Sequence, residues 1–145
     1  MRHLFENHDL VTERCGQLID VTDDVVGAVA RSDVANGMAL VYTPHTTCAV
    51  VINEPENGFM EDFRELLEQL APLERNYRHD EFDLAVHADE PPNGHAHCRA
   101  ALLASSSQAI PVVDGALLLG TYQRIFFCEL DRSRTRKVFI QVLGE

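Results

Sequence analysis

The chain has 145 residues, a mass of 16.2 kDa and a formal net charge of −11. This length predicts a single domain, covering residues 1–145, that buries a core without disulfides. The acidic charge argues against nucleic acid as a partner, because a polyanion is repelled. No apolar run approaches the roughly 18 residues that cross a bilayer, and Glu6 and Asp9 stand where a signal peptide would be apolar. We therefore expect a cytoplasmic protein with no membrane partner.

Turn and strand signals alternate along the first half of the chain. Segments 3–11 and 16–21 are predicted to be extended, and a short helix is predicted from Thr22, because a hydroxyl followed by two aspartates is typical of an N-cap. After an Asn-Gly turn, the β-rich runs 38–42 and 48–52 predict two further strands.

The second half begins with the clearest helix, which runs from Asn57 to the residue before Pro72 with apolar side chains at helical spacing. Four later runs predict strands, with an Asp-Gly hairpin turn between the first two: 109–113, 116–119, 125–130 and 137–143. Strands at both ends with two or three helices between them predict an α+β fold with mostly antiparallel, sandwich-like sheets.

The cysteines and histidines differ in how they are spaced. Four cysteines lie far apart with no Cys-x-x-Cys pair, which favours reduced thiols over disulfides or a zinc ribbon. Four of the seven histidines fall within 19 residues, beside four acidic side chains. These residues are His79, His87, His95, His97, Asp80, Asp83, Asp89 and Glu90. Imidazole and carboxylate are the ligands that zinc prefers, and the alternative is a polar, solvated loop.

His45 lies in a segment that suits an anion or a metal-bound ligand. Pro44 removes a backbone donor and holds Thr43 extended, so a turn begins here, and Thr46 and Thr47 add hydroxyls beside the imidazole. The alternative is a turn whose threonine hydroxyls only satisfy backbone groups.

Segment 91–103 has two possible geometries. On a strand, His95 and His97 would share one face and chelate one ion, whereas on a helix they would lie about 200° apart. Asn93 as an N-cap and the following alanines and leucines favour the helix. His97 is then the preferred ligand, with His95 reaching in from the start of the helix.

Several blocks of the sequence, in order, resemble the YjbQ family. Residues 45–54 are similar to its "HT(S/T)-small-A…NE" block, and residues 93–103 to its "N-A-x-A-H-I-K-A-S-L-L-G" segment. Residues 110–126 are similar to its "I-P-V…G…L-G-T-W-Q-x-I" stretch, and residues 134–137 and 144–145 to its close. The resemblance implies a small α+β protein that forms trimers and is of the type labelled secondary thiamine-phosphate synthase.

The resemblance also implies a site. Its histidines correspond to His45, His79 and His97, as catalytic residues and as ligands of a divalent metal, with zinc the expected ion. Three imidazoles would leave a fourth position open for water or substrate, as in catalytic zinc sites. The residues expected to bind the phosphorylated substrate are Thr46, Thr47, Arg99, Gln123 and Arg124.

Three functions remain open at this point. As an enzyme, the chain would join thiazole phosphate to an aminopyrimidine-methyl diphosphate, with positive charge assisting departure of pyrophosphate. As a binding protein, it would hold a metal or a small phosphorylated metabolite without turnover. As a third possibility, the metal would hold an oligomer together.

Self-association is expected, with a homotrimer as the assembly. The apolar residues of 125–128 and 138–140 are consecutive rather than alternating, which predicts strands that are covered on both faces. A neighbouring subunit would supply the second cover. The alternative is a two-sheet sandwich that buries both faces within the chain.

Overall fold

The computed structural model describes residues 1–86 and 90–145, and the side chains of these residues apart from 83–85. His87 and Asp89 of the predicted histidine-rich cluster, and the side chain of Asp83, lie outside the described part. The elements in chain order are β1 (Arg2–Val11), β2 (Gln17–Asp20), α1 (Thr22–Ser32), β3 (Gly37–Tyr42), β4 (Cys48–Asn53), α2 (Asn57–Leu70), α3 (Arg78–Val86), α4 (Gly94–Leu103), β5 (Ser107–Val113), β6 (Ala116–Leu117), β7 (Arg124–Glu129) and β8 (Thr135–Gly144).

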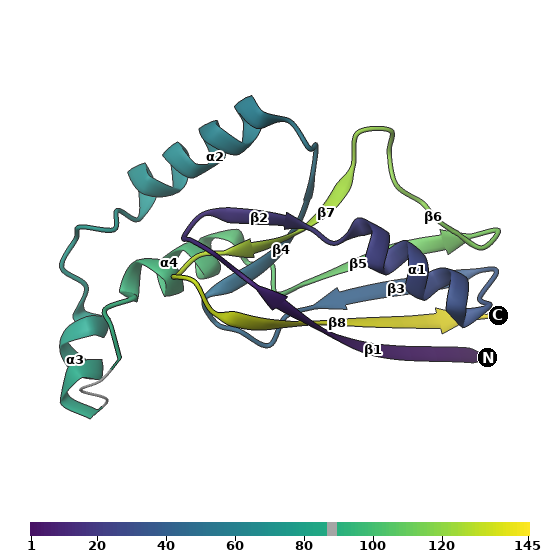
Figure 1. Cartoon of the computed structure of the whole chain (residues 1–145), viewed down its shortest axis with the longest axis horizontal. Coiled ribbons are helices and arrows are strands. Elements are labelled where there is room, and N and C mark those ends of the chain that lie inside the picture. Colours follow the sequence, from purple (N-terminus) through teal and green to yellow (C-terminus); the bar gives the residue numbers. More distant parts are fainter. Residues whose placement is uncertain (87–89) are drawn as a thin grey trace.

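The strands form two sheets, one of five strands in the order β1-β8-β3-β5-β6 and one of three in the order β2-β7-β4 (Figure 1). All of these pairings are antiparallel. The predicted α+β class with mostly antiparallel sheets is therefore confirmed. The Asp114-Gly115 turn is also confirmed, since both residues have positive φ, 50° and 77°, as a two-residue hairpin loop requires.

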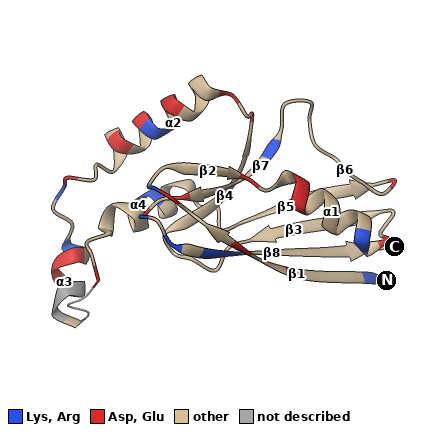
Figure 2. Cartoon of the chain, in the orientation of Figure 1, with Lys and Arg blue, Asp and Glu red and all other residues tan. Residues whose placement is uncertain are grey.

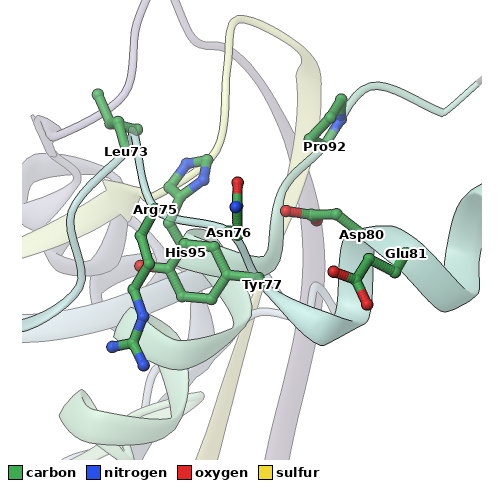
Figure 3. A pocket seen from close by; sticks show the side chains of 8 residues that line it. All are labelled: Leu73, Arg75, Asn76, Tyr77, Asp80, Glu81, Pro92 and His95. Carbon is green, nitrogen blue, oxygen red and sulfur yellow. The ribbon is translucent and has the colours of Figure 1, made fainter.

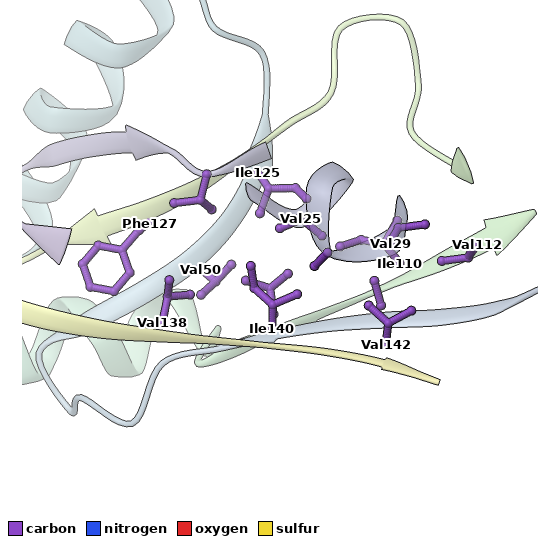
Figure 4. Close-up of a cluster of buried hydrophobic side chains, with 14 of the residues drawn as sticks. Val25, Val29, Val50, Ile110, Val112, Ile125, Phe127, Val138, Ile140 and Val142 are labelled. Atoms are coloured by element: carbon purple, nitrogen blue, oxygen red, sulfur yellow. The ribbon is translucent and has the colours of Figure 1, made fainter. Parts of the chain in front are cut away.

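The main core lies between the two sheets and is completed by α1, which contributes Val25 and Val29 (Figure 4). Strand β7 supplies Ile125 and Phe127 to this core. A second, smaller cluster on the other side of β7 contains Cys128 and Leu130 together with residues of α2 and α4. Burial of β7 on both faces explains its unbroken apolar run, and both covers come from the same chain.

Strand β8 behaves differently. Val138, Ile140 and Val142 are buried, whereas Phe139 lies on the outer face of the five-stranded sheet, stacked on Phe5 and Tyr42. Phe5 and Tyr42 are themselves 56% and 39% exposed. The run Val138-Phe139-Ile140 therefore alternates between a buried and an outer face, so the alternative in which the chain itself buries both faces does not hold for this strand.

The described part contains four α-helices, where the sequence predicts two or three. The missed helix is α3, and no buried apolar stripe is found among its described side chains: Phe82 is 73% exposed and Val86 is 74% exposed. Without such a stripe the sequence gives no helical periodicity to detect. The contact that places α3 is polar, because Asp80 accepts hydrogen bonds from the backbone N–H groups of Asn93 and Gly94 at the start of α4, at 2.9 and 2.8 Å.

The cap of α1 differs from expectation, whereas α2 begins at Asn57 as expected. The hydroxyl of Thr22 caps no backbone group of α1; instead it accepts the N–H of Ile125 at 2.8 Å and so ties the helix to β7. Helix α2 is capped by the carboxylate of Glu56, which accepts the N–H groups of Gly58 and Phe59. Among the described residues, no helix has the length and apolar composition needed to span a bilayer.

Candidate functional site

Three segments that are distant in sequence meet beside the end of β7. They are the loop that carries His45, the start of α4, and the turn between β7 and β8. Leu130 donates its N–H to the carbonyl of Thr47 at 3.2 Å, and Asp131 accepts the amide N–H of Asn93 at 3.3 Å. The β7–β8 turn therefore joins the His45 loop to the histidines around α4.

His79 of α3 and His97 of α4 lie side by side, with ring centroids 4.4 Å apart and a 55° angle between the rings. The Nε2 of His79 is 3.2 Å from the Oδ1 of Asn93. Because the amide nitrogen of Asn93 is directed to Asp131, its oxygen accepts here, and Nε2 of His79 carries the proton. The Nδ1 of His79 is left with its lone pair, which suits a metal ligand or a proton acceptor.

His45 is oriented by the backbone. The N–H of Lys137 donates to its Nε2 at 2.9 Å, so in this arrangement Nδ1 carries the proton. Burial lowers the pKa of His45, and the positive charge of Arg136 lowers it further. His45 is therefore a neutral imidazole that presents one N–H donor near neutral pH.

A buried ion pair holds the start of β8 in place behind His45. Arg136 donates from Nε and Nη2 to the two carboxylate oxygens of Glu129, both at 2.7 Å, and the two side chains are 4% and 0% exposed. Glu129 also accepts from the hydroxyl of Thr12 at 2.8 Å, and Arg136 donates to the hydroxyl of Thr47 at 3.2 Å. The Thr47 hydroxyl is thus engaged inside the protein, whereas Thr46 is exposed.

Basic side chains gather at this end of the molecule, each paired with a carboxylate. Basic residues colour the start of β8, whereas acidic residues are spread over α2 and α3 (Figure 2). Arg132 and Arg134 share the carboxylate of Glu90 at 3.1 and 3.0 Å and also approach Asp131. Both arginines remain 32% exposed, so a solvent-borne anion can reach them.

Three of the predicted substrate-binding residues lie elsewhere in the chain. Arg99 is buried and bonds the carbonyl of Ala71 and the carboxylate of Glu68. Arg124 is at the opposite end of β7 from Glu129 and pairs with Asp20 at 2.7 Å. Gln123 accepts the N–H of Gly120 within the loop before β7. The structure of one chain does not bring these three side chains to the histidines.

The three histidines predicted to bind zinc do not form one ligand set in this structure. In the described ranges, no group of three or more His, Cys, Asp or Glu side chains is arranged to hold a metal ion. His79 and His97 are neighbours and His79 has the hydrogen-bonded support that metal-bound histidines show. His45 does not fit, since its Nε2 lone pair receives the Lys137 N–H and its Nδ1 carries a proton. The residues present therefore fit two imidazole ligands and not three.

His95 confirms the helical geometry of segment 91–103. Helix α4 begins at Gly94, so His95 and His97 point to different sides of it, and only His97 faces His79. The sequence reasoning missed Glu129 and Asp131 as parts of this end of the molecule. Their signal was two carboxylates, on either side of Leu130, directly after the apolar run 125–128, because charged residues at such positions are seldom buried unless paired.

Comparison with known proteins places the chain in a family. The model of the family described as UPF0047 protein YjbQ-like matches residues 6–145. The chain belongs to this family. A UPF0047 protein of Archaeoglobus fulgidus is 45% identical over 134 residues, which are 92% of this chain and 97% of that protein. UPF0047 protein YugU of Bacillus subtilis is 33% identical over 135 residues, 92% of this chain and 94% of that protein.

Solved structures share the family's fold. A YbjQ-like protein of unknown function from Sulfolobus solfataricus has a TM-score of 0.88 at 34% identity, covering 99% of this chain and 98% of that one. A hypothetical protein from Aeropyrum pernix has a TM-score of 0.86 at 38% identity, covering 98% and 99%. The family resemblance expected from the sequence is confirmed, and the similarity assigns no activity.

Proposed function

We propose that this chain binds a small phosphorylated metabolite beside His45, Thr46 and Arg134. The observation that carries the proposal is the hydrogen bond from the Lys137 backbone to Nε2 of His45. It leaves the N–H of a neutral imidazole on the other nitrogen. Thr46, the next residue, is exposed, and the charge of Arg134, a residue 32% exposed, is near enough to lower the pKa of His45. Donors fixed in this way favour an anionic oxygen over a cation.

The reaction that this site would serve is the one implied by the thiamine-phosphate synthase type. The ring nitrogen of thiazole phosphate forms a bond to the methylene carbon of an aminopyrimidine-methyl diphosphate, and the bond from that carbon to the diphosphate oxygen breaks. In this proposal His45 and Arg134 hydrogen-bond the diphosphate and stabilise the charge that grows on it as it leaves. His79 orients its Nδ1 toward the bound compound through the Asn93–Asp131 support.

A divalent ion, with zinc the expected one, would be held by His79 and His97 and would supply further positive charge to a phosphate oxygen. His45 is assigned as a hydrogen-bond donor and not as a ligand. The binding of the phosphorylated compound rests on His45 and Arg134 and is independent of whether the ion is present.

The test combines calorimetric titration of thiazole phosphate with measurement of pyrophosphate release when both substrates are supplied. His45→Gln and Arg134→Gln are expected to weaken binding at least about tenfold, the size of one lost charge-assisted hydrogen bond. His8→Gln is the matched control, because His8 bonds Glu6 on β1. Equal affinities of all three variants would refute the proposed binding site. Binding without pyrophosphate release would refute the reaction and identify a non-catalytic binding protein.

A further inference from the structure

A cavity of about 400 Å³ lies at the start of α4, where His95 is part of its lining (Figure 3). Its walls come from the segment between α2 and α3, the first turn of α3 and the start of α4. Leu73 and Tyr77 give it an apolar wall, and Asp80, Glu81 and His95 give it polar groups. Its volume falls within the range of small-molecule sites. It does not include His45, His79 or His97, so it is separate from the site proposed above.

His95 carries an unmet hydrogen-bonding requirement at this cavity. The residue is only 7% exposed, and its Nε2 is buried with no hydrogen-bond partner in the part of the chain that the structure describes. A buried polar atom without a partner destabilises the folded chain, and a ligand that supplies the partner removes this cost. A neutral imidazole has a lone pair on one of its two nitrogens, so Nε2 can accept a hydrogen bond from a ligand in the cavity.

Close packing holds the cavity wall in place. Gly94 permits this packing, since a Cβ at that position would lie 2.4 Å from the Cβ of Tyr77. The Tyr77 ring is 6.5 Å from the His95 ring, and its hydroxyl donates to the carbonyl of Pro72 at 2.7 Å. Tyr77 therefore has its polar atom satisfied elsewhere and presents its ring as an apolar surface.

The charges around the cavity favour a cation. Asp80 is held by the two N–H groups at the start of α4, and Glu81 stands beside it on α3. Among the residues that line the cavity, Arg75 carries the positive charge, and its guanidinium lies 5.5 Å from the centre of the Tyr77 ring. A ligand with one positive nitrogen and a flat body would meet the carboxylates at one end and the aromatic wall along its length.

We propose that this cavity binds a small organic amine, whose ammonium group lies toward Asp80 and Glu81 and whose second polar hydrogen is donated to Nε2 of His95. The ligand supplies the partner that the buried nitrogen lacks, and the two carboxylates select its charge. This assignment does not depend on the proposed phosphate site.

The test uses tyramine, which carries an ammonium group, an aromatic ring and a hydroxyl, against 4-hydroxyphenylacetate, which has the same ring and hydroxyl with a carboxylate. Calorimetric titration of the full chain at about 150 mM salt, where the screening length is about 8 Å, is expected to show at least tenfold tighter binding of tyramine. Equal affinities, or no binding of tyramine at millimolar concentration, would overturn the proposal.

Variants make the assignment specific. His95→Phe is expected to abolish tyramine binding while leaving the free energy of unfolding equal or higher, because it removes a buried polar atom that has no partner. Glu81→Gln is expected to weaken binding about fivefold. Glu65→Gln, on the wall of a different cavity beside Arg99, makes the same charge change and is expected to leave the affinity unaltered. Tyramine binding that survives His95→Phe, or that falls equally in both glutamate variants, would refute it.

Discussion

Replacement of Glu129 by glutamine tests whether the buried ion pair holds this end of the fold together. The change removes one charge while it keeps the shape of the side chain, and it leaves Arg136 charged and 4% exposed. Loss of one partner of a buried pair typically costs about 3–5 kcal/mol. The carboxylate here accepts two hydrogen bonds from Arg136 at 2.7 Å, one from Thr12 at 2.8 Å and one from the N–H of Asp131 at 3.0 Å, so we expect a loss of about 4 kcal/mol.

Urea unfolding, followed by far-UV circular dichroism at one protein concentration, measures this loss. With a slope of about 2 kcal/mol per molar urea, a loss of about 4 kcal/mol lowers the midpoint by about 2 M. Glu6→Gln is the matched control, because Glu6 pairs with Arg31 at 2.8 Å on the surface, where such a pair contributes about 0–1 kcal/mol.

The double variant Glu129→Leu with Arg136→Met separates the cost of an unpaired charge from the value of the pair itself. Replacement of both partners by apolar side chains is often neutral or stabilising, so most of the lost stability should return. A single variant within about 1 kcal/mol of the parent would refute the reasoning, as would a double variant no more stable than the single one.

Three further predictions concern the site and the assembly. The pKa of His45 is below its usual value, so the stability that its neutral ring contributes is complete above about pH 6.5 and is lost as the pH falls through the folded-state pKa. The amide signal of Lys137 should change over the same pH range in a nitrogen-15 NMR titration. A His45 that titrates at or above pH 6.5 would contradict this prediction. Gly94→Ala should destabilise the chain by about 1–3 kcal/mol in urea unfolding, because its Cβ would overlap that of Tyr77; an unchanged midpoint would show that α4 shifts freely. Light scattering coupled to size exclusion should give a trimer, as the exposed aromatic face around Phe139 favours association; a single species at 16.2 kDa would exclude it.

Local sequence patterns were sufficient to predict secondary-structure elements whose conformation depends on residues near them in the sequence. The run 125–130 predicted a buried strand, the Asp114-Gly115 pair predicted a hairpin, and the spacing of apolar residues in 59–70 predicted α2. Each of these features depends on neighbouring residues: a φ preference, an alternation or a 3.6-residue period. The family also followed from short blocks of sequence.

The site depended on contacts between distant segments. The segment around His97 was predicted to be helical, which separated it correctly from His95, but nothing local showed that α3 would bring His79 against it. Arg99 and Arg124 were expected at the site because they lie in blocks that resemble the family. Arg99 is buried and pairs with Glu68. Arg124 lies at the start of β7, and the six residues of this strand separate it from the site beside Glu129.

The sequence by itself determined the α+β class, the two-faced burial of β7 and the turn in the His45 segment, because these follow from residue type and short-range geometry. Only the tertiary structure decided which nitrogen of His45 carries the proton, since that depends on the N–H of Lys137, 92 residues away. The same holds for the buried Glu129–Arg136 pair and for the unpartnered nitrogen of His95. Hydrogen bonding and desolvation are properties of the assembled surroundings, and no local pattern encodes them.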